Sequence, residues 1–305
     1  MKKILVTGSG GFIGQHLVPA LTAQGHTVIT ADRKDGIDLC DKQQVDALPD
    51  VDIVVHLAAY NGTKHFYKQP LNVVRDGVLP TQHLIDRYAG KIERFVFAGT
   101  CESYAGAVDL FNYPVPTDEK VPLVISDVTN PRWSYAGSKI VNEIQCVAAH
   151  AQLGQEYTIV RYHNVYGPGQ IDHFIPEFYQ RALDGDLTLH GWENTRSFMY
   201  VSDAIAATCR VIFEQNFANQ IINIGADDEI SIQALARQIL QQAGIPGDVI
   251  CLPAPEGSVK RRCGNIEKFH SLTDFEPTVA LAQGIRLTLE SLDKFSHVAP
   301  GITQS

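Results

Sequence analysis

Short apolar segments alternate with longer segments of helical spacing along most of the chain, and this alternation constrains the fold more than any other feature. The apolar segments are rich in Val and Ile, carry few charges and cover residues 3–8, 27–32, 52–59, 94–99, 157–167 and 220–225. Such runs are typical of parallel strands that are buried on both faces. Between them, residues 11–25 and 134–154 place apolar side chains at helical spacing and end at glycine. The alternation predicts an α/β fold built on a doubly wound parallel sheet.

The composition excludes several classes of protein. A formal net charge of −9 leaves no basic surplus for nucleic acid or for an anionic membrane surface. The short basic runs 33–34 and 260–262 suit a small phosphate better than a polymer. The 6 cysteines are scattered, which argues against a disulfide framework and against a metal site. No apolar run has the length of a signal-peptide core or a membrane span. We therefore expect a soluble cytoplasmic protein with no metal and no nucleic-acid or membrane partner.

Three glycines follow the first apolar segment and open the first helical one. Gly8 permits a tight turn, Gly11 lets the backbone approach a pyrophosphate, and Gly14 lets the helix pack against the strand. Phe12 and Ile13 lie between them, at the start of the expected helix. The N-terminus of that helix then faces the phosphates. A glycine triplet alone also suits a plain strand-to-helix turn, so its interpretation depends on the residue at the end of the second apolar segment.

A carboxylate ends that second segment, at the position that a dinucleotide site needs. Asp32 is this residue, and it can accept hydrogen bonds from the ribose hydroxyls of a dinucleotide. The negative charge of Asp32 would repel the 2′-phosphate of NADP, so this residue favours NAD. Arg33 keeps NADP open, because an adjacent arginine can accommodate that phosphate. We interpret this part of the chain as an NAD-binding Rossmann domain.

The strand–helix alternation weakens after the fifth apolar segment. Prolines recur there, at Pro176, Pro246, Pro253, Pro255 and Pro277. The sequence predicts a Rossmann domain over residues 1–167 and a smaller C-terminal α/β substrate-binding domain over residues 168–305. Residues 200–225 are expected to return to the main sheet.

A tyrosine and a lysine lie four residues apart at the start of the second helical segment. Tyr135 and Lys139 therefore share one face of that helix. A free phenol has a pKa near 10 and is a poor base at neutral pH. A nearby ammonium and an oxidised nicotinamide ring, both positive, favour the phenolate and make it a competent base. An isolated pair of this kind is common by chance, so the pair gains its meaning from the glycine loop.

Together, the loop and the pair resemble the short-chain dehydrogenase/reductase superfamily, and most closely its extended branch of NAD-dependent nucleotide-sugar epimerases and dehydratases. The resemblance covers nearly the whole chain and includes the motifs TGSGGFIG, HLAA, RYHNVYGPGQ and RSFMYVSDA. It implies a nucleotide-sugar substrate and a homodimer formed by the helix of Tyr135 and a helix near residues 71–88. It also implies further cofactor contacts at Asp38, Leu39, Leu57, Ala58 and Ala59, and substrate contacts at Thr100, Asn164 and Arg196.

The resemblance gives a role to the triplet Thr100, Cys101 and Glu102. In the family, a Ser or Thr at the position of Thr100 hydrogen-bonds the sugar C4 hydroxyl while Tyr135 removes its proton and hydride passes to NAD. The resulting 4-ketone acidifies the C5 hydrogen and makes the carboxyl group of a uronic acid labile. Glu102 stands where the dehydratases place the base that removes the C5 proton. Cys101 replaces their usual Asp, and a thiol with a reference pKa of about 8.5 is mostly protonated and is a different proton donor.

The triplet leaves several reactions open. It resembles 5,6-dehydratases of the family, whereas UDP-glucuronate decarboxylases also carry Glu at the position of Glu102, and residues 131–135 (PRWSY) are similar to some of these decarboxylases. A packed Cys101 and a solvent-facing Glu102 would give the triplet only a structural role. We expect dehydration with C5 proton abstraction, ahead of 4-epimerisation and then of decarboxylation. A net reductase would consume the cofactor, and an idle NAD-binding module would not need Thr100, Tyr135 and Lys139.

Overall fold

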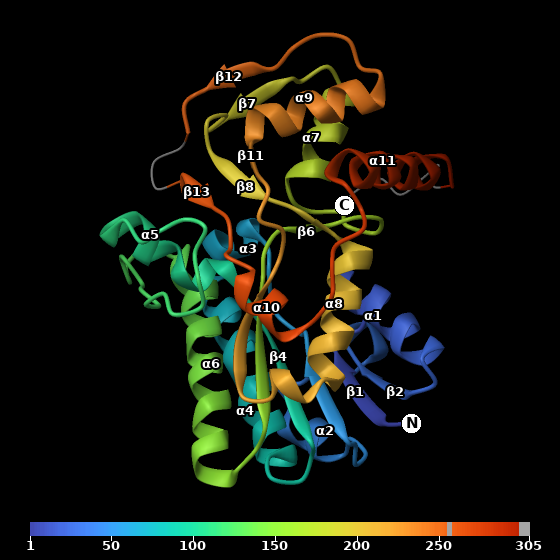
Figure 1. Cartoon of the computed structure of the whole chain (residues 1–305), viewed down its shortest axis with the longest axis vertical. Helices are drawn as coiled ribbons and strands as arrows, with labels where there is room; N and C mark the ends of the chain where they lie inside the picture. The colour runs from blue at the N-terminus through green and yellow to red at the C-terminus, as the bar shows by residue number, and fades with distance from the viewer. Residues whose placement is uncertain (255–257, 299–305) are drawn as a thin grey trace.

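The structure, a computed structural model, describes residues 1–254 and 258–298. A sheet of six strands, in the order β10-β5-β4-β3-β1-β2, forms its centre (Figure 1). Neighbouring strands are parallel throughout. Each predicted apolar segment supplies one of them: β1 (Lys3–Thr7), β2 (Thr27–Ala31), β3 (Ile53–His56), β4 (Arg94–Thr100), β5 (Tyr157–Tyr162) and β10 (Gln220–Ile224). The predicted parallel α/β sheet is confirmed.

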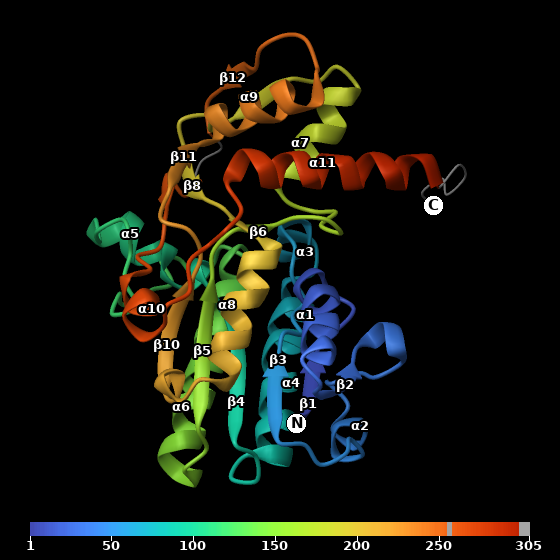
Figure 2. The same cartoon turned by 45° about the vertical axis from the view of Figure 1, so that its right-hand side comes forward.

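Helices cover both faces of this sheet, because its strands are apolar on both sides. Along β1, Ile4 and Val6 face the core that contains α1 and α8, whereas Leu5 faces the core that contains α2, α4 and α6. Figure 2 shows the two helical layers on either side of the sheet. The bounds of these helices are α1 (Phe12–Ala23), α2 (Lys42–Asp46), α4 (Pro70–Tyr88), α6 (Trp133–Leu153) and α8 (Val201–Phe213).

The helices α4 and α6 approach each other closely where small residues meet. A Cβ added to Gly77 would lie 2.8 Å from Cβ of Ser138, so only glycine allows this spacing. One turn further along α6, Asn142 Nδ2 donates to the Gly77 carbonyl at 2.8 Å. α6 ends at Leu153 because Gly154 adopts a left-handed φ of 68°. This close packing fixes the position of α6 and therefore that of Tyr135 and Lys139.

A second layer of short strands and helices lies beyond the carboxyl ends of the main strands (Figure 1). Its strands pair as β11-β8-β13, β12-β7 and β6-β9. They are β6 (Val165–Tyr166), β7 (Thr188–His190), β8 (Thr195–Ser197), β9 (Met199–Tyr200), β11 (Glu229–Ser231), β12 (Ile250–Leu252) and β13 (Arg261–Arg262). The remaining helices are α3 (Thr63–Lys68), α5 (Ala105–Phe111), α7 (Phe174–Leu183), α9 (Ile232–Ala243), α10 (Glu267–Leu272) and α11 (Leu281–Val298). None of the helices described is long and apolar enough to cross a membrane.

The strand order reverses between β1 and β3. The chain leaves β1 for β2 on one side and then places β3 on the other side of β1. In doubly wound sheets, ligands bind outside the carboxyl ends of the strands at such a point. The loops after β1, β2, β3 and β4 therefore meet where the second layer covers the sheet.

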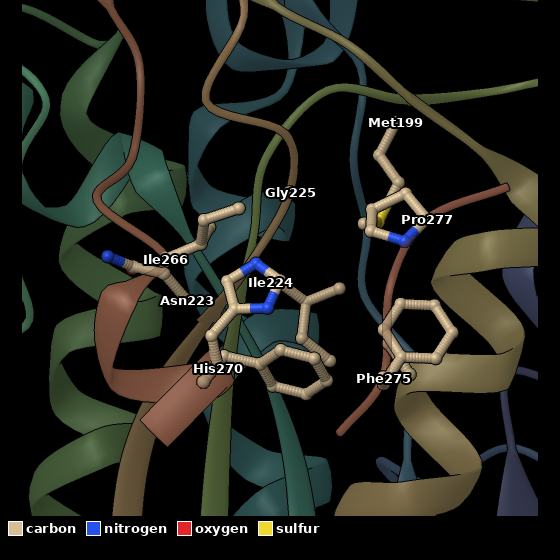
Figure 3. Close-up of a pocket in the computed structure, with 10 residues that line it drawn as sticks. Met199, Asn223, Ile224, Gly225, Ile266, His270, Phe275 and Pro277 are labelled. Carbon is tan, nitrogen blue, oxygen red and sulfur yellow. The ribbon is translucent and has the colours of Figure 1, made fainter. Parts of the chain in front are cut away.

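A small cavity under α10 lies apart from that point. Asn223, Ile224, His270 and Phe275 line it together with Met199 and Pro277 (Figure 3). Its volume is about 10 Å³, close to the space that one water molecule needs. This cavity is too small for a sugar or a nucleotide, so the candidate active site is the open edge where the loops meet.

Candidate active site

The glycine loop forms a backbone cradle at the start of α1. Gly8 adopts a φ of 67°, and a Cβ there would lie 2.6 Å from the backbone N of Ala58. A Cβ on Gly14 would lie 2.4 Å from the carbonyl oxygen of Gly8. Gly11 is the N-cap of α1 and offers no side-chain bond to the first turn, which leaves backbone N–H groups facing outward. Phe12 and Ile13 pack against the larger core. This cradle fits the pyrophosphate of a dinucleotide.

Asp32 lies beside this cradle. Its Oδ2 accepts from the backbone N–H of Gly10 at 3.0 Å, and its Oδ1 accepts from that of Lys34 at 2.9 Å. The carboxylate is thus held at the carboxyl end of β2, next to the glycine loop, and only partly buried. This is the position from which a carboxylate can bind ribose hydroxyls.

The other predicted cofactor residues surround the loop. Leu57 N donates to the Thr7 carbonyl at 3.1 Å, and the segment from Leu57 through Ala58 to the exposed Ala59 continues from β3. Asp38 and Leu39 follow β2, where Leu39 is buried in the core beneath α4. Their contacts with the cofactor remain predictions, but the chain brings all of them to the same edge of the sheet.

Tyr135 lies in the first turn of α6 and is partly buried. Its ring stacks on Phe66 of α3, with centroids 5.2 Å apart and an interplanar angle of 13°. Burial raises the pKa of Tyr135, nearby Glu102 and Cys101 raise it further, and a hydrogen bond with Thr100 opposes them. The phenol is therefore protonated in the free protein, and it needs additional positive charge to act as a base.

Lys139 lies one turn further along α6 and is buried. Its Nζ donates to the Ala98 carbonyl at 2.7 Å and lies 4.7 Å from the centroid of the Phe97 ring. It also lies 5.8 Å from the centroid of the Tyr135 ring. Burial lowers the pKa of Lys139 to about 8, although Glu143 acts to raise it. The predicted pair is therefore brought together at the end of β4.

Thr100 ends β4, and its hydroxyl hydrogen-bonds both Tyr135 and the backbone. It accepts from the backbone N–H of Glu102 at 3.3 Å, and its bond with Tyr135 acts to lower the pKa of that phenol. Cys101 instead turns into a small apolar cluster with Tyr104, Ala107 and Val121. Burial raises the pKa of the Cys101 thiol to about 11. The thiol is therefore protonated and packed, and it is a weak acid.

Glu102 is an ionised carboxylate held by two arginines. Arg262 Nη1 lies 2.7 Å from Oε1 of Glu102, and Arg132 Nη2 lies 3.6 Å from Oε2. Burial acts to raise the pKa of Glu102, but Arg262, Arg132 and Arg196 outweigh it and hold the pKa below the usual value. Glu102 does not simply face solvent.

The sequence did not indicate that Arg262 and Arg132 pair with Glu102. Arg262 belongs to β13, which pairs with β8 so that Arg262 lies opposite Arg196. The side chain of Arg262 is only 10% exposed. Both arginines lie in segments that the sequence made conspicuous, the basic run 260–262 and residues 131–135. Neither segment indicated that the two arginines meet at Glu102.

The side chains of Arg196 and Asn164 donate hydrogen bonds to backbone carbonyls. Arg196 Nη2 donates to the Val259 carbonyl at 2.9 Å, and Nη1 donates to its own neighbour Thr195 at 2.7 Å. Burial and the adjacent Arg262 lower the pKa of Arg196 to about 10. Asn164 Nδ2 donates to the Ser197 carbonyl at 2.8 Å, which ties the end of β5 to β8. Arg196 therefore lies within the arginine cluster, and Asn164 supports the strand that carries it.

The fold and these residues define a class of proteins: Rossmann-type NAD-binding proteins in which a Tyr–Lys pair and a threonine lie at the end of a central strand. The profile of the NAD dependent epimerase/dehydratase family matches residues 4–225. The chain belongs to this family, and NAD is its cofactor.

The relatives act on nucleotide sugars in several ways. The chain is 31% identical to a UDP-N-acetyl-alpha-D-glucosaminuronate decarboxylase of Bacillus cytotoxicus, covering 95% of this chain and 97% of that protein. It is 29% identical to UDP-glucuronic acid decarboxylase 1 of Xenopus tropicalis, covering 96% of this chain and 72% of that protein. Among solved structures, UDP-glucose 4-epimerase of Thermotoga maritima with UDP-glucose has a TM-score of 0.85 at 25% identity, with 96% of this chain and 99% of that chain covered. These proteins share the family but differ in reaction.

Proposed function

We propose that the protein decarboxylates a uronic acid linked to a nucleoside diphosphate, through a transient 4-keto sugar. The observation that carries the proposal is the ion pair between Glu102 and Arg262, whose Nη1 and Oε1 atoms are 2.7 Å apart. A general base works best with a pKa near the working pH. Glu102 is ionised and its pKa is lowered, so it is a weak base for a C5 proton. Decarboxylation needs no such base, because carbon dioxide leaves in place of the proton.

The charge of the site also suits a uronic acid. Arg132, Arg196 and Arg262 all act on Glu102. The same three arginines and Lys260 act on Asp109, whose pKa is raised by burial, so four cations lie near two carboxyl groups. A nucleoside-diphosphate uronic acid brings a diphosphate and a sugar carboxylate, and guanidinium groups bind both in a forked geometry. In this proposal Arg196 binds the diphosphate and Arg262 binds and orients the C6 carboxylate, while Glu102 fixes the position of Arg262.

The first chemical step uses the Tyr–Lys pair. Thr100 hydrogen-bonds the sugar C4 hydroxyl, and Tyr135 accepts the proton of that hydroxyl once Lys139 and the cofactor favour its phenolate. Bound NAD would supply the oxidant by accepting a hydride from C4 and later returning it. The glycine cradle and Asp32 would hold the cofactor.

The second step follows from the 4-ketone. The C6 carboxylate is then β to a carbonyl, so the C5–C6 bond breaks with loss of carbon dioxide and its electron pair passes into the C4 enolate. A solvent-derived proton adds to C5 and restores the ketone. Tyr135 returns its proton to the C4 oxygen when that carbon is reduced. The residues of the chain thus orient the carboxylate and exchange one proton at C4.

Elimination of water, the reaction that the sequence favoured, has less support from this geometry. It requires a base at C5 and an acid at the C6 hydroxyl. Glu102 is paired with two arginines, and Cys101 is packed among apolar side chains with its pKa raised to about 11. Neither group is tuned for those tasks.

Carbon dioxide release separates the candidate reactions. The purified protein would be incubated in heavy water with NAD and UDP-glucuronate or UDP-N-acetylglucosaminuronate labelled with ¹³C at C6. The expected result is one labelled carbon dioxide for each pentose nucleotide formed, with one deuterium at its C5.

Other outcomes would overturn the proposal in recognisable ways. Inversion at C4 with the label retained would identify a 4-epimerase. Loss of water with the label retained would identify a dehydratase. Neither change, with NAD still bound to a folded protein, would leave an NAD-binding module without this activity.

We also propose that the protein is a homodimer that pairs through α4 and α6. Val141, Ile144 and Val147 lie three residues apart on α6 and form one exposed apolar stripe. On α4, Leu71 and Val74 are 79% and 43% exposed. A second copy would cover these side chains, as large exposed apolar patches mark interfaces. Sedimentation should give a dimer at micromolar concentration, and Ile144→Asp should give a monomer; a monomeric unmutated protein would contradict the proposal.

A further inference from the structure

The arginine that follows Asp32 has all three guanidinium nitrogens engaged. Arg33 Nη1 donates to Asp76 Oδ2 at 2.7 Å. Its Nη2 and Nε both donate to Asp38 Oδ1, at 3.0 and 3.3 Å. A guanidinium binds phosphate through these same forked N–H groups. The groups that a 2′-phosphate of NADP would need are therefore directed at two carboxylates.

Asp76 is the more firmly placed of the two carboxylates. It lies in α4 with its side chain 5% exposed, whereas that of Asp38 is 46% exposed. Arg75 Nε also binds Asp76, at 2.7 Å from Oδ1, and the Cys40 thiol donates to the same oxygen at 3.5 Å. Burial acts to raise the pKa of Asp76, but Arg75 and Arg33 outweigh it and keep the carboxyl ionised. Asp76 is thus a fixed negative charge beneath Arg33.

We propose that Asp76 determines the choice of NAD over NADP by holding Arg33 away from the adenosine ribose. Asp32 repels a 2′-phosphate directly, and Asp76 withholds the one adjacent arginine that would attract it. The selectivity therefore depends on a residue in a different element from the ribose-binding loop. This inference concerns the cofactor site alone and is independent of which sugar reaction the protein catalyses.

The cost of releasing Arg33 follows from burial. Turning Arg33 toward a phosphate would leave Asp76 with Arg75 as its partner in a poorly hydrated position, and a buried charge that loses a partner is strongly destabilising. The same movement would free Asp38 at little cost, because that carboxylate is half-exposed. Asp76, rather than Asp38, therefore sets the penalty for accepting NADP.

The neighbouring lysine does not replace Arg33. Lys34 Nζ donates to the Gly10 carbonyl at 2.6 Å, and its backbone N–H donates to Asp32. Its ammonium is thus held by the Gly10 carbonyl, and a 2′-phosphate would gain it only by breaking that hydrogen bond. Release of Arg33 is then the main route to NADP binding.

The test measures binding of the two reduced cofactors to the full chain, after removal of any nucleotide that co-purifies. NADH and NADPH are titrated separately, and binding is followed by the fluorescence of the nicotinamide ring. Asp76→Asn should strengthen NADPH binding about tenfold relative to NADH, as expected for one charge-assisted hydrogen bond gained. Asp50→Asn is the matched control, because it removes an aspartate paired with Arg87 at 2.6 Å and changes the net charge equally.

A second substitution tests whether the gain passes through Arg33. In an Arg33→Met background, Asp76→Asn should give no gain in NADPH binding. A gain that persists without Arg33, or no gain in a folded Asp76→Asn variant, would overturn the proposal.

A variant that leaves Asp76 in place guards against misfolding of the first one. Asp32→Ser removes the direct repulsion but keeps Arg33 held by Asp76, so NADPH should still bind more weakly than NADH. If Asp32→Ser alone made NADPH the preferred cofactor, the hold of Asp76 on Arg33 would have no consequence and the proposal would fail.

Discussion

The two sides of the candidate active site differ in what shifts the pKa values of their side chains. The cofactor side contains Tyr135 and Lys139, and the sugar side contains Glu102 and Arg262. On the cofactor side, burial dominates: it raises the pKa of Tyr135 and lowers the pKa of Lys139 to about 8. Both groups are pushed toward their neutral forms. On the sugar side, pairing dominates: Glu102 and Arg262 lie 2.7 Å apart, and the pKa of Glu102 is lowered in spite of its burial.

The difference indicates when each side becomes active. The sugar side is charged before any ligand arrives, so the proposed anionic substrate would meet charges that are already in place. On the cofactor side, burial keeps the Tyr135 phenol protonated although the Lys139 ammonium lies nearby, and an oxidised nicotinamide ring would add the positive charge that favours the phenolate. Electrostatic preorganisation thus serves binding on one side, whereas proton transfer on the other waits for the cofactor.

The largest effect is expected on the cofactor side, from Tyr135→Phe. This change removes the proton acceptor but almost no volume. Turnover should therefore fall by about a hundred- to ten-thousand-fold, while NAD remains bound. Steady-state kinetics and the nucleotide content of the purified variant would measure both. Tyr162→Phe is the matched control. It also removes one phenol hydroxyl, but that hydroxyl contacts Thr208 of α8 at 2.8 Å and not a proposed catalytic residue. Retained activity in Tyr135→Phe would refute the proposed proton transfer.

On the sugar side, Arg262→Met should have the next largest effect. It removes the guanidinium proposed to bind the C6 carboxylate, and it also removes an ion-pair partner of Glu102. The value of kcat/KM for a nucleotide uronic acid should therefore fall about a hundredfold. Binding of UDP-glucose, which lacks the carboxylate, should change much less. Arg261→Met provides the control, since Arg261 pairs with Glu229 instead, with Nε and Oε1 at 3.0 Å. An equal loss for both sugars would argue against carboxylate recognition.

Burial of Lys139 predicts a pH effect on stability. The folded pKa of about 8 lies below the reference value of 10.5, so the unfolded chain binds this proton more tightly. The cost of burying the charge is fully present below pH 8 and disappears as the pH rises toward 10.5. Relative to Lys139→Met, the unmutated protein should therefore gain about 3 kcal/mol between these limits. Denaturant titrations of both proteins across that range would measure the difference, and a constant difference would contradict the assigned burial effect.

The cofactor side could be predicted from the sequence because its parts are local. The glycines span one turn between β1 and α1, and Tyr135 and Lys139 share one helix, so spacing alone brings them together. The six main strands could be predicted for the same reason, since each is a continuous apolar run. Arg33 could be placed beside Asp32 from the sequence, but its partner Asp76 could not, because it lies in α4.

The sugar side could not be predicted in the same way. Arg262 reaches Glu102 from β13, a strand of two residues, and no periodic pattern exists at that length. Its register against β8 depends on the packing of the second layer, where strands are short and far apart in the chain. The sequence also did not indicate the direction of the Cys101 side chain, which packs against Tyr104, Ala107 and Val121.

The smallest expected effect, from Glu102→Gln, decides what that residue does. If Glu102 only fixes Arg262, the amide keeps one hydrogen bond to the guanidinium, and kcat/KM should fall about tenfold. Carbon dioxide and product should still form in equal amounts. If Glu102 were the C5 base, the loss should be a hundred- to ten-thousand-fold, deuterium exchange at C5 should stop, and NADH should accumulate after hydride transfer. Glu229→Gln, in the adjacent pair with Arg261, controls for the charge change. The tenfold result would mean that the cofactor side carries out proton transfer and the sugar side only recognises the substrate. The larger loss would mean that the sugar side also takes part in proton transfer.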